Sequence, residues 1–249
     1  MHYGQLLGEL RAAGAYGVAD LAARAGISRP TLYRLLAGAV PRADDLEELA
    51  IAAGRQLDFD ARPLSDPLAA VSGRALLGDE AMAPWSDEAD AWRERLRRFT
   101  AGRGPDGRDV AIIDEAGRAS APGDRDGGVH LRGAHRNVDR LVSAGQASRQ
   151  RWALSGWAAL DALGLDAEAP TIMWVEDART VGQLLADSFR PTGREDADLL
   201  VVEAHPSVFA GATAVEDVHL VAPLQAYIDA TGLGGDPRDR VLAHLGGAS

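Results

Sequence analysis

Two arginines, Arg29 and Arg34, are the side chains best suited to recognition chemistry in this 249-residue sequence. A guanidinium can donate two parallel hydrogen bonds to the O6 and N7 atoms of guanine in the major groove of DNA. The nearby hydroxyl groups of Ser28, Thr31 and Tyr33 can bond phosphates or base edges. These five residues are therefore the candidate DNA-reading set, and their chemistry requires no cofactor and no metal.

The segment 18–38, VADLAARAGISRPTLYRLLAG, must position these side chains. Apolar residues recur at helical spacing over 18–25 and again over 29–37, which predicts two short helices. Gly26 lies where the chain must turn sharply, and Ser28 is a favourable N-cap for the second helix. This pattern is typical of a helix-turn-helix, whose second helix enters the major groove. A helical hairpin that only packs is the alternative, but turn, cap and outward arginines together favour DNA binding.

The distribution of charge supports a local DNA contact in an acidic chain. The net charge is −11, but residues 1–42 carry five arginines against Glu9 and Asp20, a net charge of +3. Within that stretch, Arg24 and Arg42 are the expected phosphate contacts. Because the rest of the chain would repel DNA, we expect a modest, salt-sensitive affinity per protomer that is helped by dimerisation.

The first quarter of the chain resembles a known family. Residues 1 to about 59, and above all the run LAARAGISRPTLYRLLAGAVPRADDLEELAIAAG, are similar to an Xre/Cro-type helix-turn-helix domain. Flanking helices are expected over 1–13 and 43–53. The resemblance implies a compact helical bundle that is often used as a homodimer on inverted repeats in double-stranded DNA.

Composition excludes several other classes of protein. The absence of cysteine excludes disulfides and thiolate zinc sites, and the absence of lysine excludes Schiff-base chemistry and a Walker lysine. No apolar run is long enough to cross a membrane, and the first residues do not form a signal peptide. We therefore expect a cytoplasmic protein with no membrane contact.

Two prolines, Pro63 and Pro67, indicate a boundary after the first domain. We expect a helix-turn-helix domain over 1–62, a helical linker region over 63–108 and a larger α/β domain over 109–249.

The linker region is predicted to contain helices over 68–77 and 87–99. The second of these includes WRERLRRF, a basic amphipathic pattern. Such a helix could touch phosphate, or it could be an ordinary packed helix with solvated arginines. The surrounding acidic residues favour packing, and the helix could also contribute to a dimer interface.

From residue 109 onward, strand-like and helix-like segments alternate, which predicts an α/β-type domain with a small mixed sheet. The whole chain is thus expected to be α+β, with an all-α helix-turn-helix bundle first. Ser155 and Asp177 are expected helix N-caps. The expected strands cover 110–113, 129–131, 151–154, 171–175, 199–203 and 218–221, and the expected helices 137–145, 156–163, 178–188, 223–231 and 237–245.

Four segments of this domain resemble the C-terminal domain of the AbiEi family of type IV antitoxins. They are RWALSGWAALDALGL, PTIMWVED, LLVVEAHPSVF and VHLVAPLQAYIDATGLGGDPRDRVLAHL, and the closing VAPLQAYIDATGLGG is the most specific part. The resemblance implies a regulator that represses its own operon and counters a cognate toxin of the nucleotidyltransferase type.

Catalysis by the chain itself is not expected. Nucleotidyl transfer needs two carboxylates on one strand face to hold metal ions, whereas Glu176 and Asp177 are adjacent and would point to opposite sides. His130 and His135 are off helical ligand spacing, and no G-x-S-x-G motif is present. The sequence therefore predicts a DNA-binding transcriptional regulator and not an enzyme, and the AbiEi resemblance implies that the regulator is a repressor.

A ligand-responsive transcription factor is the alternative function. Trp152, Trp157 and Trp174 could line a small-molecule pocket in the larger domain. Large aromatic side chains more often fill a core, and we favour that interpretation.

Overall fold

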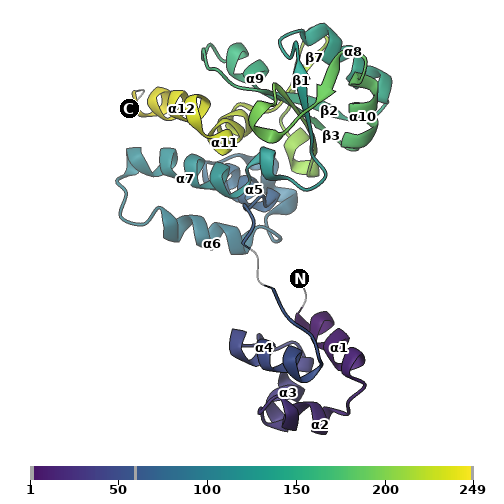
Figure 1. The fold of residues 1–249 in the computed structure, drawn as a ribbon. Helices are drawn as coiled ribbons and strands as arrows, with labels where there is room; N and C mark the ends of the chain where they lie inside the picture. Colours follow the sequence, from purple (N-terminus) through teal and green to yellow (C-terminus); the bar gives the residue numbers. More distant parts are fainter. Residues whose placement is uncertain (1–2, 59–60, 248–249) are drawn as a thin grey trace. The chain divides into compact units, whose positions relative to one another are not determined.

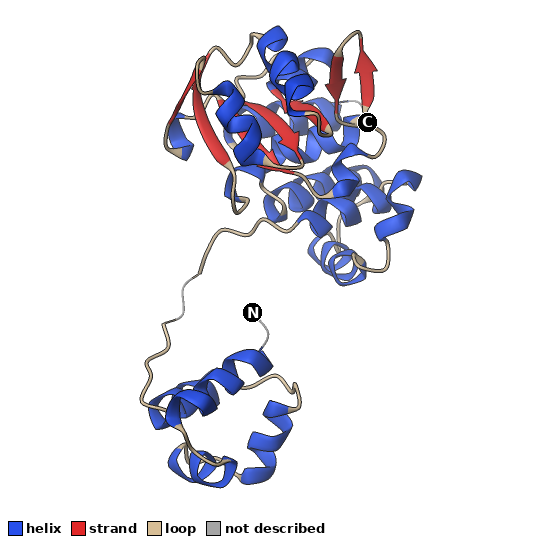
Figure 2. Ribbon diagram, turned by 90° about the vertical axis from the view of Figure 1, so that its right-hand side faces the viewer, coloured by secondary structure: helices blue, strands red, loops and turns tan. Residues whose placement is uncertain are grey.

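The computed structural model describes residues 3–58 and 61–247, and the chain forms two compact units, Met1–Arg62 and Pro63–Ser249 (Figure 1). The first unit is helical, and the second contains a seven-stranded sheet with helices around it (Figure 2). The predicted mixture of an all-α bundle and an α/β-type domain is therefore confirmed. Across the described part of the chain, no helix has the length and apolar character that a membrane span requires.

Four short helices build the first unit around one apolar core. The helices are α1 (Tyr3–Gly14), α2 (Val18–Arg24), α3 (Arg29–Leu36) and α4 (Ala43–Ala52). Their apolar side chains recur every three or four residues and meet at the centre of the bundle. The most buried of them include Leu7, Leu21, Leu32 and Leu49.

Residues 63–108 belong to the second unit and do not form the separate linker region that the sequence suggested. In the second unit α5 (Pro67–Leu76) and α6 (Asp90–Phe99) pack with α7 (Pro105–Ala119) and α11 (Pro223–Leu233). The packing of α5 on α7 is close because Gly73 has no side chain: a Cβ there would lie 2.7 Å from the Cβ of Ala116. These contacts join segments far apart in the sequence, which is why the order of residues alone did not reveal them.

The strand predicted over 110–113 is wrong, because these residues lie inside α7. The run VAII is apolar at every position, so it has no period that distinguishes strand from helix. Within α7, Ile113 and Ala116 lie three residues apart and pack together against Ile228 of α11. The tertiary neighbours therefore decide the conformation of this run.

The sheet of the second unit is mixed, with strand order β4-β1-β5-β3-β2-β7-β6. β3 and β5 are parallel, β2 and β7 are parallel, and the other neighbouring strands are antiparallel. The strands are β1 (Val129–Gly133), β2 (Trp152–Gly156), β3 (Thr171–Val175), β4 (Phe189–Pro191), β5 (Leu199–Glu203), β6 (Thr213–Val215) and β7 (Val218–Leu220).

Both faces of this sheet are covered, so its central strands are apolar at nearly every position. α8 (Val138–Ser148) and α10 (Ala178–Leu185) cover the face that receives Met173 and Val175 of β3. α11 covers the opposite face (Figure 1). Trp174 of β3 is buried on that face. Successive side chains of β3 point to opposite faces of the sheet, so the strand contributes to the apolar core on each face.

Buried hydrogen bonds connect the sheet to α11. The carboxylate of Asp229, almost fully buried, accepts hydrogen bonds from Ser155 Oγ at 2.6 Å and from Trp174 Nε1 at 2.8 Å. Gln225 Nε2 donates to its other oxygen at 2.8 Å. Ser155 was predicted to cap a helix, but it lies in β2, and α9 (Trp157–Ala162) begins only after Gly156. Burial raises the pKa of Asp229, against the opposing effect of these hydrogen bonds.

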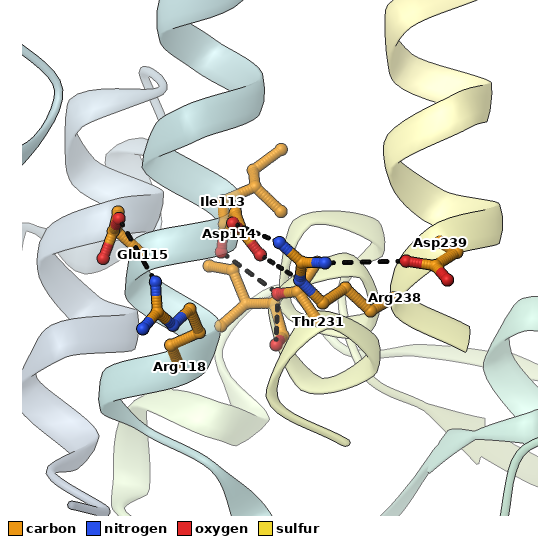
Figure 3. A network of polar contacts seen from close by, with 8 residues as sticks. Ile113, Asp114, Glu115, Arg118, Thr231, Arg238 and Asp239 are labelled. Atoms are coloured by element: carbon orange, nitrogen blue, oxygen red, sulfur yellow. Dashed lines mark hydrogen bonds and ion pairs between the residues drawn. The ribbon is translucent and has the colours of Figure 1, made fainter. Parts of the chain in front are cut away.

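A second set of polar contacts joins α7 to the closing helices (Figure 3). Arg238 of α12 (Gly235–Gly247) donates to both carboxylate oxygens of Asp114, at 2.7 and 2.9 Å. This two-bond geometry is the strong form of an arginine–carboxylate pair. Thr231 Oγ1 of α11 also donates to the carbonyl oxygen of Ile113 at 3.1 Å. These contacts therefore hold α11 and α12, near the end of the chain, against α7.

Candidate nucleic-acid interface

The candidate reading helix, α3, separates buried and exposed residues cleanly. Leu32 and Leu35 are buried in the core of the first unit. Arg29, Tyr33 and Arg34 are exposed, and their spacing places them on one face of the helix. Tyr33 is 61% exposed, which is unusual for an aromatic residue on a small bundle. This face presents two guanidinium groups and a phenol to solvent.

Ser28 and Thr31 form the N-terminal cap of α3. The hydroxyl oxygen of Ser28 accepts a hydrogen bond from the backbone nitrogen of Thr31 at 3.2 Å, as the sequence predicted. The two hydroxyl groups also lie 2.8 Å apart, within hydrogen-bond distance. The structure thus gives these two residues a capping role, and their contact with DNA stays a prediction.

The turn between α2 and α3 depends on one glycine. Gly26 has a φ of +66°, a left-handed conformation that glycine adopts without strain. A Cβ at Gly26 would meet nothing within 4 Å, so the requirement comes from the backbone conformation and not from crowding. The backbone nitrogen of Ile27 then donates to the carbonyl oxygen of Ala22 at 3.0 Å, which closes the end of α2.

The two expected phosphate contacts, Arg24 and Arg42, differ in their surroundings. The guanidinium of Arg24 lies 4.6 Å from the ring centroid of Tyr16, and its Nε donates to the carbonyl oxygen of Ala52 at 3.3 Å. Arg24 is therefore engaged within its own unit. Among the described residues, Arg42 has one acidic neighbour, Asp44 at 3.8 Å, and both side chains are more than four-fifths exposed. Of the two, Arg42 is the better placed for a phosphate.

One exposed apolar residue escaped the sequence reasoning. Val40 follows α3 in the loop before α4 and is 77% exposed, although the neighbouring Pro41 is buried. Gly38, with a φ of +100°, begins this loop. An aliphatic side chain left in water beside a reading helix can contact a thymine methyl group or a sugar. A branched apolar residue between a glycine and a proline was the available signal.

The comparison with known protein families agrees with this geometry. Residues 2–58 match a family model described as "Helix-turn-helix domain". The first unit is a helix-turn-helix DNA-binding domain. No curated protein and no solved structure matches the chain. The resemblance of the second unit to AbiEi antitoxins therefore stays a prediction.

The carboxylates that might suggest catalysis in the second unit have other partners. Glu176 accepts a hydrogen bond from Arg151 Nε at 2.7 Å, and this contact lowers its pKa. Asp177 caps α10, as predicted: it accepts from the backbone nitrogens of Arg179 and Thr180 at 3.0 and 3.1 Å. Among the residues described, no group of three or more His, Asp or Glu side chains could hold a metal ion.

The three tryptophans considered as pocket walls occupy different environments. Trp174 and Trp152 are buried on opposite faces of the sheet. Trp157, partly buried, lies beside Val215 and Val218 at an open hollow next to the β6–β7 hairpin. Two of the three are therefore core residues.

Proposed function

We propose that the chain is a sequence-specific transcriptional repressor that binds an inverted repeat in double-stranded DNA as a homodimer. The observation that carries this proposal is the exposed face of α3, with Arg29, Tyr33 and Arg34, on a helix-turn-helix unit. Arginine reads guanine bidentately, and the tyrosine hydroxyl can bond a phosphate or a base edge. Arg42 adds a phosphate contact beside the same helix.

The charge of the reading unit supports the proposed dimerisation. Residues 1–62 carry seven arginines against eight acidic residues, so the unit has a net charge of −1. One unit therefore attracts DNA only through its local arginines. Two linked units gain affinity because the second binds at a high effective concentration once the first is bound. A two-fold dimer also matches the symmetry of an inverted repeat.

The first test is fluorescence anisotropy of the full chain on a duplex from upstream of its own gene and on a scrambled duplex. Arg29→Ala and Arg34→Ala should each lose site preference, because each lost base contact costs about 1–3 kcal/mol of discrimination. Arg179→Ala is the matched control, since it removes an exposed arginine from α10 in the second unit.

Three outcomes separate parts of this proposal. Site preference lost in both α3 variants and kept in the control supports direct reading by α3. Equal binding to both duplexes by the unmodified chain would contradict sequence-specific recognition. A complex of one protomer per duplex, measured by analytical ultracentrifugation, would contradict the homodimer.

For the second unit, we infer the role of the antitoxin of a type IV pair. Support comes from the four AbiEi-like segments of the sequence, which lie on β2 with α9, on β3, on β5 and on β7 through α12. The test is co-expression with a nucleotidyltransferase-type toxin encoded next to the gene. Growth rescue by the full chain and by Arg29→Ala, which leaves the second unit intact, would support it. Absence of rescue by either would reject it.

The remaining alternatives have less support. The burial of Trp152 and Trp174 leaves little of the proposed pocket wall for a small-molecule sensor. The engagement of Glu176 by Arg151 and of Asp177 by the start of α10 disfavours metal-dependent transfer chemistry. We therefore infer that the chain acts by binding and not by catalysis.

A further inference from the structure

Helix α6 and the loop after it concentrate positive charge in an acidic protein. Residues 90–104 carry five arginines against Asp90 and Glu94, a net charge of +3, whereas the whole chain has a net charge of −11. A local reversal of this size attracts an anionic partner even when the rest of the molecule repels it.

Some of these arginines have structural partners. Arg93 pairs with Asp90 at 2.7 Å and donates to the carbonyl oxygen of Ser86 at 3.1 Å. The guanidinium of Arg95 lies 4.8 Å from the ring centroid of Trp92. Both guanidinium groups already have neighbours within α6, so neither side chain is the best candidate for an external ligand.

Arg97 and Arg98 are different, because both are exposed in the last turn of α6. Neither has an acidic partner among the residues that the structure describes. The guanidinium of Arg98 lies 6.0 Å from the ring centroid of Phe99, which is 49% exposed. Two unpaired guanidinium groups and an exposed ring therefore lie together at the end of this helix.

The geometry of α6 turns these groups away from the protein. Its buried residues, Trp92 and Leu96, are four apart and mark the face that packs on α5 and α7. With a rotation of 100° per residue, Arg97 and Arg98 fall on the opposite side, together with Glu94. Figure 1 shows α6 on the outside of the helical layer, away from the sheet.

We propose that the exposed arginines of α6, Arg97 and Arg98, form a second DNA contact that binds the phosphate backbone outside the bases read by α3. This inference rests on the proposed DNA-binding function. Arginine suits the role because its planar fork pairs with phosphate through two hydrogen bonds. The contact is independent of sequence, since phosphates position a protein without specifying bases.

DNA is the anionic partner that the proposed function supplies, so we take it, and not an acidic protein, as the occupant of this surface. The reading unit has a net charge of −1, so phosphate contacts made elsewhere in the chain would add to its affinity. The α6 segment is one stretch of the second unit where the sign of the charge reverses, and its Arg97 and Arg98 have no acidic partner among the described residues. A repressor that gains phosphate contacts from both units can hold a site that the first unit alone would release.

The test is the salt dependence of DNA binding by the full chain. In Arg97→Ala/Arg98→Ala, the slope of log Kobs against log salt should become shallower by about 2, since each phosphate contact contributes roughly 0.9. Affinity for the operator and for the scrambled duplex should fall by the same factor. Glu94→Gln, which removes the nearby acid, should raise both affinities.

The matched control is Arg179→Ala/Arg190→Ala, which removes two exposed arginines from α10 and β4. These elements pack on the sheet and not on α6, so the control tests general charge without touching the proposed surface. Its slope should stay close to that of the unmodified chain.

Failure of this inference is distinguishable from failure of the proposed function. If the α6 double variant and the control have equal slopes and affinities, the α6 contact is wrong, whatever α3 does. If Arg29→Ala keeps its site preference but the α6 variant still loses two units of slope, the contact stands and the reading assignment of α3 fails. Binding to an acidic partner protein, with unchanged DNA binding in the α6 variant, would also overturn the contact.

Discussion

The two units of this chain are stabilised in different ways. The first has a core of apolar side chains from four helices, and its polar groups serve at the ends of helices and on the surface. The second also buries polar and charged groups, above all Arg74 and Asp229. Arg74 donates to the carbonyl oxygens of Ser207 and Ala210, so α5 is fixed to a segment more than a hundred residues away. Buried polar contacts specify one arrangement of elements, but breaking them is costly.

The largest expected loss of stability comes from a substitution that breaks buried hydrogen bonds in the second unit. Asp229→Ala would leave the donors of Ser155, Trp174 and Gln225 without their acceptor in a dry core. We expect each donor left without an acceptor to cost about 1–3 kcal/mol in the free energy of unfolding. Urea unfolding followed by tryptophan fluorescence measures this, because all five tryptophans lie in the second unit.

The control for Asp229→Ala is Asp187→Ala, which removes an exposed carboxylate from the same unit and should change little. Equal unfolding midpoints for the two variants would show that the Asp229 contacts are dispensable.

The next effect concerns two glycines that are needed for different reasons. In Gly117→Ala, the new methyl group would overlap Thr231 Oγ1 and the carbonyl oxygen of Ile228, so α7 and α11 must separate. We expect a loss of about 1–3 kcal/mol or more, because backbone atoms cannot move aside cheaply. Gly107→Ala lies in the same helix with nothing within 4 Å of its Cβ, and it should be neutral or stabilising.

Tryptophan-detected unfolding again separates the two variants. If Gly107→Ala lost as much unfolding free energy as Gly117→Ala, the cause would be the change within α7 and not the close approach of α11.

A smaller effect is expected in the first unit, where a helix cap is the polar contact at stake. Ser28→Ala removes the acceptor for the Thr31 backbone nitrogen and should cost about 1 kcal/mol. Hydrogen exchange of the α3 amides is the measurement, since tryptophan fluorescence does not report on this unit. Ser28→Asp should preserve the cap while its charge repels phosphate. Normal amide protection with weaker DNA binding in Ser28→Asp would therefore separate the two roles of this position.

The last prediction concerns the pH dependence of the stability of the second unit. The pKa of Asp229 is raised above its ordinary value of 3.8 by burial, so the folded state binds this proton more tightly than the unfolded state. Its contribution to stability is full below 3.8 and is lost as the pH rises through the folded pKa. Glu176, Asp177 and Asp236, whose pKa values are lowered by hydrogen bonds, act in the opposite direction: their contributions are lost on acidification.

Urea midpoints between pH 7 and about pH 4 test this sign, since stability there depends on protons bound in each state. Relative to Asp229→Asn, the unmodified chain should gain stability as the pH falls. A parallel pH course for the two proteins would contradict a raised pKa in the folded state.

The same contrast explains what the sequence could predict. In the first unit the helices, the turn at Gly26 and the Ser28 cap follow from residues within a few positions of one another, and the structure agrees. In the second unit the run at 110–113 and the role of Ser155 depend on partners in α11, more than seventy residues away. Local chemistry fixes a cap or a tight turn, whereas the neighbours of an apolar run are set by the whole fold.

The candidate site shows the same limit at the level of single residues. The helical period correctly placed Arg29, Tyr33 and Arg34 on the exposed face of α3. It could not show that Arg24 lies over Tyr16 and donates to the carbonyl oxygen of Ala52. The second contact depends on where α4 packs, which the period of α2 does not determine. The helical period also says nothing about exposure in a loop, so it did not identify Val40.

The separation of faces on α3 has an evolutionary consequence. Leu32 and Leu35 carry the packing of this helix, while Arg29, Tyr33 and Arg34 contribute nothing to that core. Substitutions at the three outward positions can therefore change which bases are preferred without a penalty in folding. A duplicated gene could acquire a new operator in a few steps, each leaving a stable protein for selection to act on.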